Sequence, residues 1–150
     1  MTPLASSSKA GVLKGNRDFN VDTFFLPGGC NGRCNNAYVE SKCQEVGGVL
    51  AGLQNLDEAN WFISEHRRFS DGRASWVWIG AKRVPNTNNY AWTDPYVDGN
   101  GYLKWRNSKG PDRGPEANYN CAMLNAKGML TMETPCNEWY PTFVCVKPSN

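Results

Sequence analysis

Residues 76–80, Trp76-Val77-Trp78-Ile79-Gly80, are the densest run of β-forming residues in the chain and predict a strand. The two tryptophans alternate with Val77 and Ile79, so we expect both faces of this strand to be covered. Trp78 is expected in the core and Trp76 as a surface contact. The run also divides the sequence, because helical periodicity precedes it and short β-forming segments follow it.

Two segments before this strand have helical periodicity. Residues 37–46 place several apolar side chains, Cys43 among them, on one side, and Gly47-Gly48 predicts the end of this helix. A second helix is expected to begin after Asn55, a favourable N-cap residue, and to run to about Phe69. Residues 49–51 predict a short buried strand between the two helices.

Further strands are expected at both ends of the chain. Residues 21–26 are β-branched and aromatic, and Pro27-Gly28-Gly29 should end that strand. The segment from Asp94 to Glu116 has no regular pattern and predicts a long loop, a kind of segment that is usually functional or disordered. The order of elements predicts an α+β domain with an antiparallel sheet. The other expected strands are residues 90–93, 121–124, 128–130 and 142–146.

Six cysteines in 150 residues indicate disulfides and an oxidising compartment. Cys30 and Cys34 are close enough in sequence to bridge each other; a reduced protein with free thiols is the alternative. Residues 1–20 form a polar, flexible lead-in without the apolar core of a signal peptide. We therefore expect a secreted or extracellular protein whose signal was removed, with Met1 added for expression, and with one domain at residues 21–150.

The composition excludes several function classes. The chain is 40% hydrophobic and 20% charged with a net charge of +2, which gives no support for nucleic-acid binding. Its apolar runs are too short to cross a membrane. His66 is the single histidine, and no nucleophile motif accompanies it, so we expect no enzyme.

From about Val21 to Lys147 the sequence resembles the C-type lectin-like domain family. This resemblance implies an α+β fold with two helices, small antiparallel sheets, a long loop that carries the binding site, and the disulfides Cys43–Cys145 and Cys121–Cys136. The segment that contains Cys30 and Cys34 departs from the family's usual N-terminal hairpin. The matching residues are Cys43 with 47–51 after it, Trp78-Ile79-Gly80, Trp92, Trp105, Cys121, Cys136 and Cys145.

Members of this family that bind sugar through calcium use a Glu/Gln-Pro-Asn/Asp triplet and an Asn-Asp pair, because calcium takes six to eight oxygen ligands. Here the triplet position reads Gly110-Pro111-Asp112, the pair reads Met132-Glu133, and Tyr119 stands where an acidic ligand is typical. Only Asp112 and Glu133 keep a carboxylate, so we expect no cofactor and no tight calcium site. A shifted site is the alternative, made by Asp112, Glu116, Asn118 and Glu133.

The long loop also carries basic and aromatic side chains, which are favoured interface anchors. We expect non-catalytic recognition of an extracellular protein or glycan through this loop, without the family's usual calcium-dependent sugar binding. The alternatives are a lectin with a shifted calcium site or metal-free contacts, a matrix protein that binds an acidic polymer, and ordinary solvated loop residues. The candidate ligand-binding residues are Tyr102, Lys104, Arg106, Lys109, Asp112, Arg113, Glu116, Asn118, Asn120 and Glu133.

Overall fold

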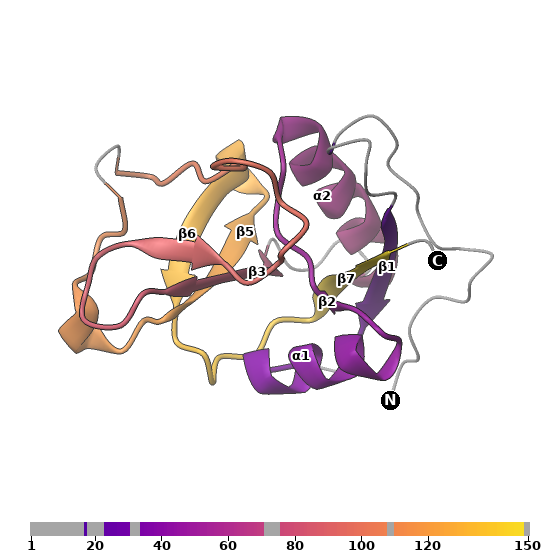
Figure 1. Ribbon diagram of the computed structural model, residues 1–150, viewed down its shortest axis with the longest axis horizontal. Coiled ribbons are helices and arrows are strands. Elements are labelled where there is room, and N and C mark those ends of the chain that lie inside the picture. Colours follow the sequence, from indigo (N-terminus) through magenta and orange to yellow (C-terminus); the bar gives the residue numbers. More distant parts are fainter. Residues whose placement is uncertain (1–16, 18–22, 31–33, 71–75, 108–109, 149–150) are drawn as a thin grey trace.

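A computed structural model describes residues 17, 23–30, 34–70, 76–107 and 110–148, and Figure 1 shows its arrangement. The two helices are α1 (Asn36–Glu45) and α2 (Leu56–Ser70). The strands are β1 (Thr23–Gly29), β2 (Val49–Leu50), β3 (Trp76–Arg83), β4 (Tyr90–Trp92), β5 (Cys121–Asn125), β6 (Leu130–Thr134) and β7 (Thr142–Pro148). Two short 3₁₀ turns are η2 (Pro115–Ala117) and η3 (Lys127–Met129).

The strands form one sheet in the order β1-β7-β3-β5-β6, with β2 on β7 and β4 on β3. Within it, β1 and β2 are antiparallel to β7, while β3 to β6 form a second antiparallel group. The two groups meet at one parallel pair, Val77 with Thr142. The α+β fold with two helices is therefore confirmed, and the small antiparallel sheets of the prediction are joined into one mixed sheet.

Both helices begin at an asparagine cap. The Asn35 side chain accepts a hydrogen bond from the Tyr38 backbone N–H at 2.9 Å, and Asn55 accepts one from the Glu58 N–H at 3.0 Å. These bonds satisfy N–H groups that have no partner within the helix. The predicted cap at Asn55 is confirmed. The helix α2 covers β1 and β7 on the right of Figure 1, away from β5 and β6.

Trp78 lies at the centre of the packing, as predicted. Its side chain is fully buried, and its indole N–H donates to the Cys34 carbonyl at 2.6 Å. Gly80 is required two residues later, because a Cβ there would lie 2.2 Å from the Leu50 carbonyl oxygen. Trp76 is 42% exposed, which confirms its expected position at the surface.

All three disulfides join the expected cysteines. Cys43–Cys145 ties α1 to β7, and Cys121–Cys136 ties the start of β5 to the segment after β6. Cys30–Cys34 closes a short loop after β1.

The first strand differs from its predicted extent. Rather than ending at Pro27, β1 continues through Pro27 to Gly29, while Val21 lies outside the described residues. Because β1 pairs only with β7, it is an edge strand, where a proline's missing N–H is tolerated. The prediction that Pro27 ends the strand was therefore wrong.

Candidate functional site

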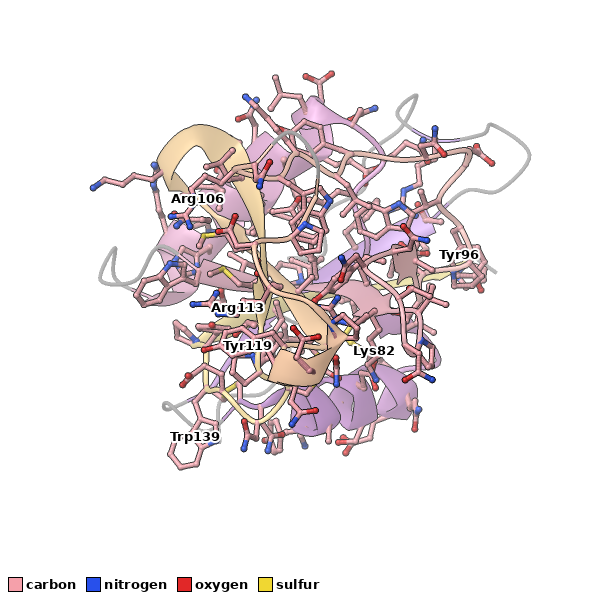
Figure 2. All side chains as sticks on the ribbon, turned by 90° about the vertical axis from the view of Figure 1, so that its left-hand side faces the viewer. Lys82, Tyr96, Arg106, Arg113, Tyr119 and Trp139 are labelled. Atoms are coloured by element: carbon pink, nitrogen blue, oxygen red, sulfur yellow. A yellow bond between two sulfur atoms is a disulfide. The ribbon has the colours of Figure 1, made fainter. Side chains whose placement is uncertain are left out.

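The candidate site lies on the long segment between β4 and β5. This segment runs over residues 93–120, and its regular structure within the described residues is limited to η2 and isolated bridges such as Trp105 with Thr131. Figure 2 faces this side of the molecule and shows Arg106, Arg113 and Tyr119 on it, with Lys82 to the right of Tyr119 in this view. The predicted long loop is thus present, and side chains from other parts of the chain hold it in shape.

A buried ion cluster holds the beginning of the loop. Arg17 donates two hydrogen bonds to the Glu58 carboxylate, at 2.8 and 2.9 Å, and one to Asp94 at 2.9 Å. The three side chains are 3%, 0% and 0% exposed. Burial lowers the pKa of Arg17, but hydrogen bonds and attraction from Glu58 and Asp94 more than offset this, so its pKa is raised overall.

Asp94 connects this ion cluster to the loop backbone through hydrogen bonds. Its other oxygen accepts from the Tyr96 N–H at 2.8 Å, and the oxygen that faces Arg17 also accepts from the Gly52 N–H at 2.8 Å. The first turn of the loop is therefore fixed to α2 and to residue 17. The sequence suggested only a flexible lead-in at residues 1–20, of which the structure describes Arg17 alone.

A second arginine, Arg83 at the end of β3, holds the other end of the loop. Its guanidinium donates to five oxygens: the carbonyls of Thr87, Arg113 and Tyr119 and the side-chain amides of Asn88 and Asn120, at 3.0–3.3 Å. Arg83 is 6% exposed. One buried cation thus links the hairpin after β3 to two parts of the long loop.

Tyr90 packs beside this arginine. The Arg83 guanidinium lies 5.0 Å from the Tyr90 ring centre, the Trp105 ring packs at 4.9 Å, and the Tyr90 hydroxyl donates to the Tyr119 carbonyl. Burial, reinforced by Glu133 and opposed by Arg83, raises the pKa of Tyr90 to about 12. Tyr90 is therefore a neutral structural member of the loop base.

The two carboxylates that remain at the calcium-ligand positions are both bound by arginine. Asp112 forms an ion pair with Arg106. Glu133, whose side chain is 3% exposed, accepts the Arg113 backbone N–H at 2.8 Å and lies 3.7 Å from the Arg113 guanidinium. The Arg113 guanidinium in turn lies over the Tyr119 ring, 4.3 Å from its centre. Figure 2 labels both side chains on the long-loop face. An arginine guanidinium therefore lies beside each of the two carboxylates.

The alternative calcium set is spread over several elements, with Asp112 before η2, Glu116 on η2, Asn118 directly after it and Glu133 on β6. Glu116 is exposed, and Asn118 lines a hollow together with Asn120, whose oxygen already accepts from Arg83. In the described part of the chain, no three Asp, Glu, His or Cys side chains are grouped so as to hold a metal ion.

The other residues of the predicted basic and aromatic patch are dispersed. Tyr102 is half-buried and donates to the Met129 carbonyl at 3.0 Å, and burial raises its pKa. Trp105 packs on Tyr90. Lys104 and Arg106 are exposed, and Lys109 lies outside the described residues. The patch thus has fewer available charges than its composition suggested, because Arg106 and Arg113 each face a carboxylate.

Two hollows open on this side of the molecule. One, of about 590 Å³, lies over the first half of the loop beside Trp92 and Asp94. The other, of about 410 Å³, lies between the hairpin after β3 and the end of the loop. Sequence reasoning missed Lys82, Arg83 and Asn86 in the second hollow, because nothing local in the sequence marks them as members of a site.

Comparison with family models matches residues 35–147 to the lectin C-type domain, which is more than half of the chain. The chain belongs to the C-type lectin domain family. As a C-type lectin-like domain it is a non-catalytic binding module. No described helix is long and apolar enough to cross a bilayer.

Solved structures of C-type lectin-like domains share the fold at low identity. Human lithostathine superposes with a TM-score of 0.71 at 16% identity, covering 97% of this chain and 92% of that one. A calcium-independent type II antifreeze protein gives 0.65 at 19%, covering 97% and 95%. The cow CD23 carbohydrate-recognition domain, with an oligosaccharide, gives 0.62 at 17%, covering 84% and 89%. A search among curated protein sequences found no significant match.

Proposed function

We propose that this C-type lectin-like domain is a secreted recognition module that binds an extracellular protein or glycan through its long-loop face without bound calcium. The observation that carries the proposal is the pairing of both surviving ligand-position carboxylates, Asp112 and Glu133, with Arg106 and Arg113. To bind there, calcium would have to displace a guanidinium from each carboxylate and still find several more oxygens.

A second observation supports a metal-free loop. Arg17 anchors the first turn of the loop through Asp94, and Arg83 anchors its last part through three oxygens, the Arg113 and Tyr119 carbonyls and the Asn120 side chain. Both cations are permanent, since arginine stays protonated at any physiological pH. The loop can therefore keep its shape whether or not calcium is present.

The surroundings of the loop agree with extracellular recognition. Three disulfides are suited to an oxidising compartment. The CD23 domain was solved with an oligosaccharide, and another relative of the same fold is named as calcium-independent. An acidic polymer is less favoured as the partner, because Arg106 and Arg113 are already paired with carboxylates.

Calorimetric titration with calcium chloride tests the proposal directly. We expect no heat of specific binding, and no change in the thermal midpoint between calcium and a chelator. The double variant Arg106→Ala with Arg113→Ala removes both competing cations and is the matched gain-of-function arm. Micromolar calcium binding to the native protein, lost in Asp112→Ala, would overturn the proposal in favour of a calcium lectin.

A glycan array and an extracellular-protein array, each run with and without chelator, identify the partner class. Binding that persists in chelator and falls in variants of exposed long-loop side chains such as Lys104 supports recognition by this face. Binding that requires calcium contradicts it.

A further inference from the structure

The hollow of about 410 Å³ has an unusual lining. It is bounded by Lys82, Arg83, Pro85 and Asn86 on one side and by Pro115, Asn118, Asn120 and Cys136 on the other; we call it the asparagine hollow. Its volume falls within the range of small-molecule sites, about 300–1,000 Å³. Asp112 and Glu133, the carboxylates at the family's calcium-ligand positions, are not among its lining residues.

The wall of the asparagine hollow carries a positive charge that has no direct carboxylate partner. All five oxygens that Arg83 contacts belong to neutral groups, and within the described residues no carboxylate oxygen lies within 4.0 Å of its guanidinium. A charge that is 6% exposed is normally paired with an opposite one. Because these five bonds use every N–H of the guanidinium, Arg83 acts on the hollow by its electric field and not by direct contact.

Lys82 supplies the direct contact at the edge of the hollow. Its ammonium has three donors, and one is directed to Glu40 at 3.2 Å. The side chain is 40% exposed, so the remaining donors are accessible from solvent. Two cations therefore face the asparagine hollow, and Glu40 is the carboxylate paired with the outer one.

The asparagine amides complete the lining with neutral hydrogen-bonding groups. Asn86 and Asn118 adopt φ angles of 64° and 60°, a region that L-residues seldom occupy. Their side-chain amides form no hydrogen bond with any other described residue. Asn120 uses its oxygen for Arg83 and keeps its NH2 group. Three amides thus offer donors and acceptors to a ligand.

We propose that the asparagine hollow binds the carboxylate-bearing ring of an acidic saccharide, such as a sialic or uronic acid. The carboxylate meets Lys82 in the field of Arg83, and the ring hydroxyls pair with the amides of Asn86, Asn118 and Asn120. A saccharide fits better than an acidic peptide, because the amides of Asn86 and Asn118 can each donate to and accept from neighbouring hydroxyls, while the Asn120 NH2 group donates. This inference rests on the proposed function and names its ligand class and its place.

Titration of the whole chain with N-acetylneuraminic acid and with glucuronic acid, each beside its methyl ester, tests the carboxylate. We expect the acids to bind at least tenfold more tightly than the esters, since hydrogen bonds to charged groups are the stronger ones. Galactose 6-sulfate forms a third arm of the titration. If the sulfate binds as tightly as the two acids, any saccharide anion suffices and the proposed requirement for a carboxylate is wrong. The same affinity for acid and ester would overturn the proposal.

Substitutions of the lining residues test whether the saccharide binds in the asparagine hollow. Lys82→Met should weaken binding about tenfold, and Asn86→Gly and Asn118→Gly about threefold each, because glycine keeps the positive φ and removes only the amide. Glu40→Gln should strengthen binding about threefold by releasing Lys82. Lys127→Met, an exposed lysine outside the hollow, is the charge-matched control and should leave binding unchanged.

The outcomes separate this inference from the proposed function. Binding of an acidic saccharide that disappears with chelator refutes the calcium-independent function. Binding that is lost in Arg113→Ala but kept in Lys82→Met shows that the saccharide binds elsewhere on the loop face and not in the asparagine hollow. Tighter binding of a glutamate-rich peptide than of either sugar overturns the saccharide class.

Discussion

Replacing Arg17 with alanine is expected to lower the free energy of unfolding by about 3–5 kcal/mol, the usual effect of removing one partner of a buried ion cluster. The change leaves two carboxylates, Glu58 and Asp94, fully buried without their shared cation. It also removes a hydrogen bond to the Gly52 carbonyl at 3.1 Å. The contribution is large because no water can take the place of the guanidinium without entering the packed interior.

The assay is reversible thermal or urea unfolding of the intact, disulfide-bonded chain. Each kcal/mol moves the midpoint of a domain of this size by about 2–4 °C, so a decrease of about 6–20 °C is expected. Arg106→Ala is the matched control, because its ion pair with Asp112 joins side chains that are 64% and 27% exposed. Such a pair contributes about 0–1 kcal/mol.

The charges of Glu58 and Asp94 allow lost charge pairing to be separated from lost packing. A triple variant in which Met, Gln and Asn replace Arg17, Glu58 and Asp94 should recover part of the loss. A decrease no larger than that of Arg106→Ala, or no recovery in the triple variant, would refute this reasoning.

Two further predictions concern Tyr90 and the disulfides. Because the pKa of Tyr90 is raised to about 12 in the folded state, the stability its neutral phenol contributes is complete below about pH 10 and is lost as the pH rises toward 12. Phenolate absorbance should show a tyrosine that titrates near pH 12 and is missing in Tyr90→Phe, and an unchanged titration would contradict this. Replacing Cys43 and Cys145 with serine should cost about 4–5 kcal/mol, against about 3 kcal/mol for Cys121 and Cys136, because the bridged residues are 102 and 15 positions apart. Urea unfolding without reductant compares them, and equal losses would argue against the chain-entropy account.

The elements near Trp78 could be predicted because their signals are local. A period-two run, an asparagine cap and a glycine stop each act within a few residues, and β3, α1 and α2 appear where these signals placed them. The union of the strands into one sheet was not visible in the sequence. It depends on the single pair of Val77 with Thr142, which no turn or short-range pattern specifies.

The candidate site, too, could be predicted only in part. The positions of Asp112 and Glu133 followed from the family's motif, but their arginine partners lie 6 and 20 residues away and depend on how the loop closes. Arg17 is the clearest omission. A lone arginine in a polar N-terminal stretch has the composition of a solvated residue, and its partners Glu58 and Asp94 are 41 and 77 positions further along.

The pairing of β1 with β7 has a mechanical consequence. Thr23 lies opposite Pro148, so the two ends of the domain emerge side by side, at the end away from the long loop in Figure 1. A pull between these ends would peel β1 from β7 one hydrogen bond at a time, until the tension reached the Cys43–Cys145 bridge. From that point the force would run along the covalent chain through the sulfur atoms and bypass residues 44–144. The long-loop face lies wholly within that bypassed segment, and of the two arginines that hold it only Arg17 lies on the loaded side.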